Sequence, residues 1–186
     1  EYAQRVSVEA ERLGRVVTNV LGYSRLERGG LAVNPQPGDL AVAVRDSVNR
    51  LTPSLQTKHA QLELTITEPL PRTRFDRDAV HQILQNLSDN AEKFSRSARE
   101  RTIRVLLAER PEGPTLSVVD RGVGVEASAR RKIFEPFARG QDPDAPPGLG
   151  IGLALVSALA QGQGARVSHS DVEGGGSCFS VTFQAC

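Results

Sequence analysis

The chain has 186 residues and a formal net charge of +1 at pH 7. This length allows one domain, or one domain with an appendage, and the near-neutral charge gives no reason to expect binding to nucleic acid or to an anionic membrane. Cys178 and Cys186 have no metal-ligand spacing, and the longest apolar stretch, residues 148–160, is shorter than the ~20 residues of a membrane helix. These features favour a globular protein of the reducing cytosol.

The first segment, residues 1–28, has the pattern of one helix. Val6, Leu13 and Val20 recur every seven residues and form an apolar seam, which requires a partner helix. Two glycines end the helix, and the Pro- and Gly-rich segment 34–38 is typical of a linker. We therefore expect two units, an N-terminal helix over residues 1–32 and a domain over residues 33–186.

In the second unit, helical and strand patterns alternate irregularly. Such an order predicts a two-layer α/β sandwich with a mixed sheet. The expected elements are a helix after Asp39, a strand around residues 62–66, a helix capped by Asp76 or Asp78 and running to about Phe94, strands at about 102–108 and 115–119, a short helix at 126–133, a helix from about Leu149 to Gln161, and a hairpin of residues 165–170 and a strand with Phe179, Val181 and Phe183, joined by the glycine turn 174–176.

Three polar side chains share one face of the helix that ends near Phe94. Asn86, Asn90 and Lys93 are spaced i, i+4 and i+7. An amide oxygen can complete a Mg²⁺ shell made otherwise of water and phosphate oxygens, and a lysine can neutralise phosphate charge. An ordinary solvated polar face accounts for this segment alone equally well.

A carboxylate follows the strand at 115–119. Asp120 comes just before Gly122 and Gly124, where it can accept a hydrogen bond from an amine such as that of adenine while the glycines let the backbone approach a flat base. A tight Asx-type turn is the alternative. A dinucleotide fingerprint fits poorly, because Pro136 arrives too soon for a full crossover helix.

The last glycine-rich segment precedes a helix. Gly148, Gly150 and Gly152 place free N–H groups and the positive end of a helix dipole where phosphates can bind, although a hinge is the alternative. The polar, Pro-rich segment 140–147 just before it predicts a mobile loop. Together the three segments predict one pocket for a Mg²⁺–nucleotide complex.

These segments resemble the sequence boxes of sensor histidine kinases, whose ATP-binding domain belongs to the class shared with gyrase, the heat-shock protein Hsp90 and the mismatch-repair protein MutL. The similarity runs in order through nearly the whole chain and implies a Bergerat-type ATP-binding fold. Residues 11–27 resemble the second helix of the dimerisation and phosphotransfer hairpin, 86–95 the N box, 120–124 the first glycine box, 134–137 the F box, 148–153 the second glycine box and 174–177 the last glycine turn.

The resemblance implies roles for individual residues. Asn90 would ligate Mg²⁺, Lys93 would contact phosphates, and Asp120 would read the adenine amine. Asn86 stands where gyrase-like relatives have a catalytic Glu, and an amide cannot act as a base, which fits a kinase rather than a hydrolase. Residues 138–147 would form the ATP lid, with Arg139 as a cation for the γ-phosphate or as a solvated surface residue, and the remaining nucleotide contacts would come from Gly122, Gly124, Phe137, Gly148, Leu149, Gly150, Gly152 and Leu153.

The family's phosphoacceptor, a His followed by an acidic residue, is not recognisable in the sequence. His59, His81 and His169 stand in other contexts, so we expect the acceptor helix to precede Glu1. The implied function is transfer of the ATP γ-phosphoryl to that histidine and onward to the receiver domain of a response regulator. The whole protein would be a homodimer through its helical hairpin, and this part would be the cytoplasmic portion of a sensor that can be membrane-bound.

Two other functions stay open on the sequence alone. The short, Pro-rich lid segment 142–147 is compatible with a degenerate kinase that serves as a nucleotide-dependent interaction module. A serine kinase of the anti-sigma type would share the ATP boxes but would lack the N-terminal heptad helix, and it is the least favoured.

Overall fold

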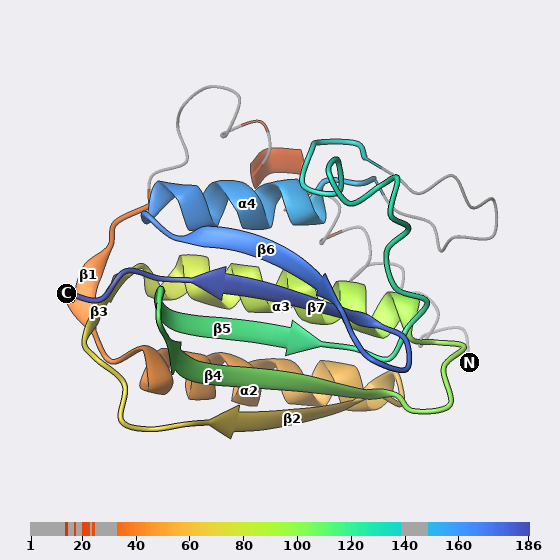
Figure 1. Ribbon diagram of the computed structural model, residues 1–186, viewed down its shortest axis with the longest axis horizontal. Coiled ribbons are helices and arrows are strands. Elements are labelled where there is room, and N and C mark those ends of the chain that lie inside the picture. Colours follow the sequence, from red (N-terminus) through yellow and green to blue (C-terminus); the bar gives the residue numbers. More distant parts are fainter. Residues whose placement is uncertain (1–13, 15–16, 18–19, 23, 25–32, 139–148) are drawn as a thin grey trace.

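The computed structural model describes residues 14, 17, 20–22, 24, 33–138 and 149–186 (Figure 1). Helices pack on one face of a five-stranded sheet whose strand order is β2-β4-β5-β7-β6. β2 is parallel to β4, and the other neighbours are antiparallel, so the sheet is mixed and the predicted two-layer α/β sandwich is confirmed. The elements are β1 (Gln36–Gly38), α2 (Leu40–Thr57), β2 (Gln61–Ile66), β3 (Thr73–Phe75), α3 (Arg77–Phe94), β4 (Thr102–Arg110), β5 (Gly113–Val119), α4 (Gly152–Gly162), β6 (Arg166–Asp171) and β7 (Ser177–Thr182).

The two long helices begin where side-chain caps are available. The Asp39 carboxylate accepts a hydrogen bond from the Val42 amide at the start of α2, and Asp76 accepts from the amides of Asp78 and Ala79 at the start of α3. These bonds satisfy N–H groups that have no partner inside the helix. Asp76, rather than Asp78, is therefore the cap of α3.

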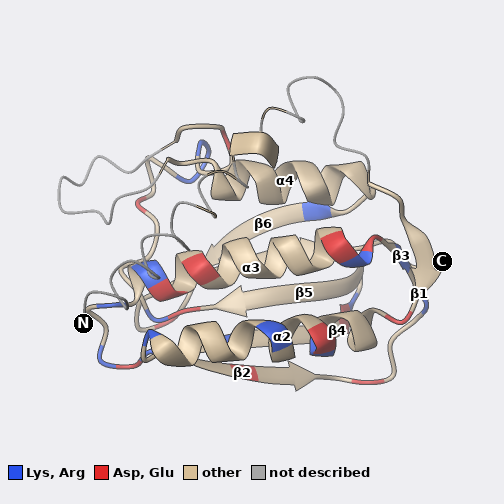
Figure 2. Cartoon of the chain, turned by 180° about the vertical axis from the view of Figure 1, so that it is seen from behind, with Lys and Arg blue, Asp and Glu red and all other residues tan. Residues whose placement is uncertain are grey.

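The core lies between the helices and the sheet. One face of each helix and alternate residues of the strands supply it, as the helical and strand periodicities require. Because the helices cover one face of the sheet only (Figures 1 and 2), the other face carries hydroxyl pairs such as Ser117 and Ser180, whose oxygens lie 2.8 Å apart. The fully buried side chains include Val44, Val80, Ile83, Leu84, Ile103, Val105, Leu107, Leu116, Val156 and Val181.

Three details differ from the sequence predictions. Residues 126–133 form consecutive turns rather than a helix, with amide-to-carbonyl bonds reaching only three residues back, for example from Lys132 to Ala129. α4 begins at Gly152 rather than near Leu149, because Gly150 has a φ of +69°, outside the right-handed helical region. Part of the segment expected to be a linker is β1, which pairs with β3.

The described residues between 14 and 24 are helical, as predicted, and the rest of that segment lies outside the described residues. Val20, from the predicted seam, is 42% exposed, and Val17 is 49% exposed. Gly22 lies against Leu155 of α4. The boundary between units at residues 32 and 33 stays a prediction. In the described ranges, no helix is both long and apolar enough to cross a membrane.

Candidate nucleotide-binding site

The polar face of α3 meets the first residue of α4. Asn86 is 8% exposed, and its side-chain amide donates to the carbonyl of Gln82 at 2.9 Å, which leaves its oxygen directed elsewhere. A Cβ placed on Gly152 would lie 3.1 Å from that Asn86 oxygen and 4.0 Å from the side-chain nitrogen of Asn90. The structure thus brings two N-box amides to the N-terminus of α4, in a space that any larger residue at position 152 would fill.

Lys93 stands one turn beyond Asn90, near the end of α3. Its ammonium lies 4.7 Å from the centroid of the Phe94 ring, within the range of a cation–π contact. The side chain is half-buried rather than extended into solvent. Its position agrees with the expected spacing on the Asn86–Asn90 face.

Asp120 occupies a buried turn directly after β5. It is 4% exposed, and its Oδ1 accepts a hydrogen bond of 2.7 Å from the Gly122 amide, so the Asx-type turn considered from the sequence is present. Burial raises the pKa of the Asp120 carboxyl, while hydrogen bonds from Gly122 and Ser177 oppose that rise. These two bonds leave acceptor capacity on the carboxylate, whose two oxygens offer about four lone-pair sites. The turn therefore positions the acid and is compatible with its binding an amine.

The end of α3 also touches the turn that contains Asp120. A Cβ on Gly122 would lie 2.6 Å from the Phe94 carbonyl oxygen and 2.9 Å from Asp120 Oδ1. Real Cβ atoms do not approach backbone so closely, so glycine is required here for packing. The N box and the first glycine box are therefore in direct contact.

The F box lies between the hairpin and the start of α4. Phe134 packs edge-on against Phe179 of β7, with ring centroids 6.3 Å apart. Phe137 is 59% exposed, and its backbone amide donates to the Gly150 carbonyl at 2.9 Å. The segment is thus anchored to the core at one end and bonded to the second glycine box at the other.

Some predicted site residues lie outside the described residues, namely Arg139, Gly148 and the rest of the lid over 139–147. Leu149 is 47% exposed at the edge of that segment, whereas Leu153 packs against the core. Gly124 lies against the Gly176 backbone of the last glycine turn.

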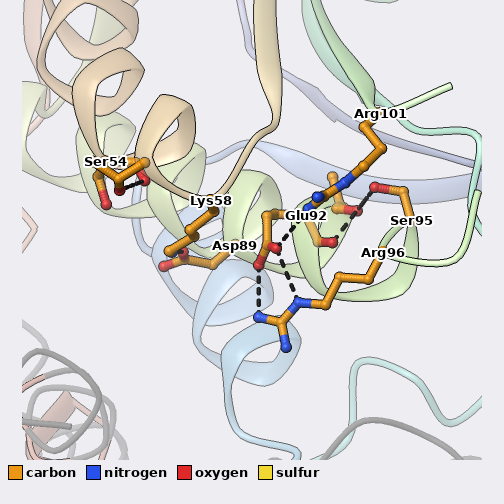
Figure 3. A network of polar contacts seen from close by, with 9 residues as sticks. Ser54, Lys58, Asp89, Glu92, Ser95, Arg96 and Arg101 are labelled. Atoms are coloured by element: carbon orange, nitrogen blue, oxygen red, sulfur yellow. Dashed lines mark hydrogen bonds and ion pairs between the residues drawn. The ribbon is translucent and has the colours of Figure 1, made fainter. Parts of the chain in front are cut away.

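A buried charge network at the end of α3 was not anticipated from the sequence (Figure 3). The Glu92 carboxylate is 3% exposed and accepts two hydrogen bonds of 2.9 Å from Arg96 and one of 3.1 Å from Arg101. Burial acts to raise the pKa of Glu92, but its arginine partners and Lys58 together hold it below the ordinary value. Beside it, the Ser95 hydroxyl donates to the Ala91 carbonyl at 2.6 Å. The network ties the last turn of α3, which carries Lys93, to the start of β4.

The i, i+4 spacing of Glu92 and Arg96 was a sequence signal for one half of this network. Arg101 could not be assigned to it, because the path of the chain between α3 and β4 decides where that side chain lies. The same holds for Lys58, which follows α2 and pairs with Asp89 of α3 at 3.0 Å.

Within the ranges that the structure describes, no three His, Cys, Asp or Glu side chains gather as a metal site would require. The described donors are amides, a lysine and the helix N-terminus. Such a set suits a cation that arrives with phosphate oxygens as most of its shell. Asp120 offers a hydrogen-bond acceptor, and the N-terminus of α4 offers N–H groups of the kind that bind phosphates.

Comparison with known proteins identifies the family of this domain. Residues 75–185 match the family model described as histidine kinase-, DNA gyrase B-, and HSP90-like ATPase. The chain is 32% identical over 183 residues to the sensor protein kinase PilS of Pseudomonas aeruginosa, covering 97% of this chain and 33% of PilS. It is 31% identical over 168 residues to the sensor protein KdpD of Escherichia coli, covering 90% of this chain and 18% of KdpD. The chain thus spans a third or less of these relatives.

Solved structures show the same fold. ShkA, solved at full length in complex with AMPPNP, superposes with a TM-score of 0.77 at 27% identity, over 100% of this chain and 39% of ShkA. The histidine kinase AdeS of Acinetobacter baumannii superposes with a TM-score of 0.73 at 21% identity, over 98% of this chain and 83% of AdeS. The chain therefore belongs to the histidine kinase-, DNA gyrase B- and HSP90-like ATPase family, and it carries the ATP-binding catalytic module of a sensor histidine kinase.

Proposed function

We propose that this chain binds Mg²⁺–ATP and donates the γ-phosphoryl group to a histidine outside residues 1–186, for relay to the receiver domain of a response regulator. The observation that supports this most is the approach of Asn86 and Asn90 to Gly152 at the start of α4. Family membership and the AMPPNP complex of ShkA support nucleotide binding by this domain.

Each described residue has a distinct role in this proposal. Asp120 accepts a hydrogen bond from the exocyclic amine of adenine; guanine presents a carbonyl oxygen there, and two acceptors would repel. Lys93 and the N-terminus of α4 neutralise the phosphates. Asn86 cannot take a proton from water, so the site favours transfer to a stronger nucleophile over hydrolysis. Catalysis then consists mainly of positioning and charge neutralisation.

The described donors fit Mg²⁺ as a companion of ATP. The Asn90 amide oxygen would be the protein ligand, and water and phosphate oxygens would supply the other ligands. When bound, Mg²⁺ would lower the negative charge on the transferred phosphoryl group. Gly148, Gly150 and Arg139 would border the phosphates, with Phe137, Leu149 and Leu153 beside them.

The acceptor is not one of the chain's own histidines. The His169 ring packs against Phe179, with centroids 5.0 Å apart, and its Nε2 is buried. His81 Nδ1 is also buried. His59 is exposed, but it follows α2 at a φ of +58°, and the next residue in the sequence is Ala60 rather than an acidic residue. A histidine on a dimerisation hairpin, to which the helix around residues 14–24 would belong, suits the role better.

The partners follow from the same proposal. A homodimer through the hairpin would bring the acceptor to this domain, and the receiver domain would take the phosphoryl group from the histidine. The cytoplasm supplies both ATP and the receiver, so this part would act there. The rival function, a nucleotide-dependent interaction module, is less well supported because each described part of the site is in place.

Labelling with γ-³²P-ATP tests the transfer. A polypeptide that extends this chain at its N-terminus to include a helix with a His followed by an acidic residue should acquire acid-labile label in the presence of Mg²⁺. Residues 1–186 alone should bind ATP without acquiring stable label. Stable label on residues 1–186 would contradict the proposed acceptor, and an extended protein that binds ATP but never labels would favour the interaction module.

A further inference from the structure

A cavity with polar lining residues lies between α2 and α3, on a different side of α3 from the nucleotide face. The two helices are in contact and lie side by side in Figure 2. At about 100° per residue, positions 81, 85 and 88 of α3 point well away from positions 86, 90 and 93. The cavity has a volume of about 170 Å³, and its lining consists of Arg50, Leu51, Ser54, Leu55, His81, Gln85, Ser88 and Asp89.

Two buried polar atoms of this lining lack a hydrogen-bond partner within the described part of the chain. Ser88 is 1% exposed, and neither its Oγ nor the Nδ1 of His81 is bonded. Most buried polar atoms in proteins are bonded, and leaving one unpaired costs about 1–3 kcal/mol. Two such atoms in one cavity indicate that a polar occupant belongs there.

The charges around the cavity indicate the sign of that occupant. Asp89 is already neutralised by Lys58 at 3.0 Å. Burial lowers the pKa of the His81 imidazole most, and the positive charge of Arg50 lowers it further. The negative charge of Asp78 opposes both effects. His81 is therefore neutral near pH 7, and the remaining charge of the cavity wall is the Arg50 guanidinium. Hydroxyl, amide and imidazole groups add hydrogen-bond donors to it.

The volume limits the size of the occupant. A cavity of about 150 Å³ holds a molecule of about six heavy atoms in another protein. From these observations we propose that the cavity between α2 and α3 is a binding site for a small oxyanion, a carboxylate or phosphate of about four to six heavy atoms. The oxyanion pairs with Arg50 and accepts hydrogen bonds from Ser54, Ser88 and His81 Nδ1–H.

Binding at this site can be followed by NMR of the imidazole rings. An anion bound beside His81 stabilises its protonated form, so saturating inorganic phosphate or acetate should raise the pKa of His81 relative to chloride at equal ionic strength. His169, whose ring packs against Phe179 of β7, serves as the internal reference and should not respond. A response to phosphate alone, to acetate alone or to both identifies which oxyanion the site accepts.

Three variants test whether the anion binds in this cavity. Arg50→Gln should reduce the anion affinity at least about tenfold, because it removes the charged donor. Ser88→Ala should reduce the affinity about threefold or more. Lys93→Gln removes a phosphate contact of the nucleotide site and should leave the His81 response unchanged.

The proposal is overturned if phosphate and acetate leave the His81 titration as it is in chloride. It is also overturned if Arg50→Gln and Ser88→Ala both respond like the wild type, since an anion would then bind adventitiously. Loss of the response in Lys93→Gln would place the anion at the nucleotide site instead. Arg50 and Ser54 are exposed, so the Arg50 variant is expected to fold.

Discussion

The Phe94 carbonyl oxygen lies so close to Gly122 that a Cβ at position 122 would be 2.6 Å from it. The last turn of α3 and the turn after β5 are therefore packed backbone to backbone. Because α3 carries Asn90 and Lys93 and the turn carries Asp120, this contact sets the distance between the phosphate end and the adenine end of the proposed site.

Gly122→Ala should weaken ATP binding by about tenfold or more while the domain stays folded. The added methyl must push α3 and the turn apart, since backbone cannot yield as a flexible side chain does. Isothermal titration calorimetry measures the affinity. Gly14→Ala is the matched control, because a Cβ there meets no atom of the described residues within 4 Å; equal affinities in the two variants would contradict the role of the contact.

Glu92→Gln should lower the free energy of unfolding by about 1–3 kcal/mol at neutral pH, because it removes charge-assisted bonds to Arg96 and Arg101. The pKa of Glu92 is held below its ordinary value. The Glu92 carboxylate therefore contributes fully to the free energy of unfolding at pH values above its pKa in the unfolded chain. This contribution is lost as the pH falls through its pKa in the folded protein. The difference between wild type and variant in denaturant unfolding should shrink in acid. Glu112→Gln, an exposed change in a turn, should show no such trend.

Lys93→Gln should weaken ATP binding about tenfold and leave adenosine binding nearly unchanged, because the ammonium acts on phosphate charge. Competition measurements with both ligands test this. Arg110→Gln removes one positive charge from the exposed end of β4 and serves as the control. An equal loss for ATP and adenosine in the Lys93 variant would indicate damage to the pocket rather than a lost phosphate contact.

The pH dependence of ATP affinity should follow Asp120. Burial raises the pKa of its carboxyl above the ordinary value, and the ionised form is the better acceptor for the adenine amine, so ATP affinity should fall as the pH is lowered through this raised pKa. Because the pKa is raised on folding, the ionised Asp120 carboxylate lowers the free energy of unfolding. This destabilisation is fully present at pH values above the pKa of Asp120 in the folded protein. Asp120→Asn should therefore be at least as stable as wild type near neutral pH, as thermal unfolding can show.

Much of the fold was predictable because local signals agreed with the tertiary packing. For α3, a cap at Asp76 or Asp78, an apolar stripe and an end near Phe94 all pointed to one helix, and the structure has it at Arg77–Phe94, capped by Asp76. β1 and β3 were missed because each has three residues and exists through pairing with the other. Residues 126–133 looked helical by composition, yet only Ile133 of that stretch packs against the core, together with Phe134 just after it, which is too little to stabilise a helix.

The candidate site was predictable in its parts but not in their contacts. The spacing of Asn86 and Asn90 placed both on one face, since helical geometry fixes that relation. Nothing local showed that Gly152 would lie against them, because that depends on how α4 crosses α3. Glu92 and its partner Arg101 were out of reach for the same reason, as the loop between α3 and β4 brings them together.

Binding of ATP through Asp120 is tested most directly by calorimetric titration of the wild type and Asp120→Asn with ATP, with and without Mg²⁺, and with GTP as the control. We expect Mg²⁺-dependent ATP binding by the wild type, no binding of GTP, and a loss of at least about tenfold in the variant. A folded wild-type chain that binds ATP no better than GTP, or a variant that binds ATP as the wild type does, would contradict the assignment of the adenine site.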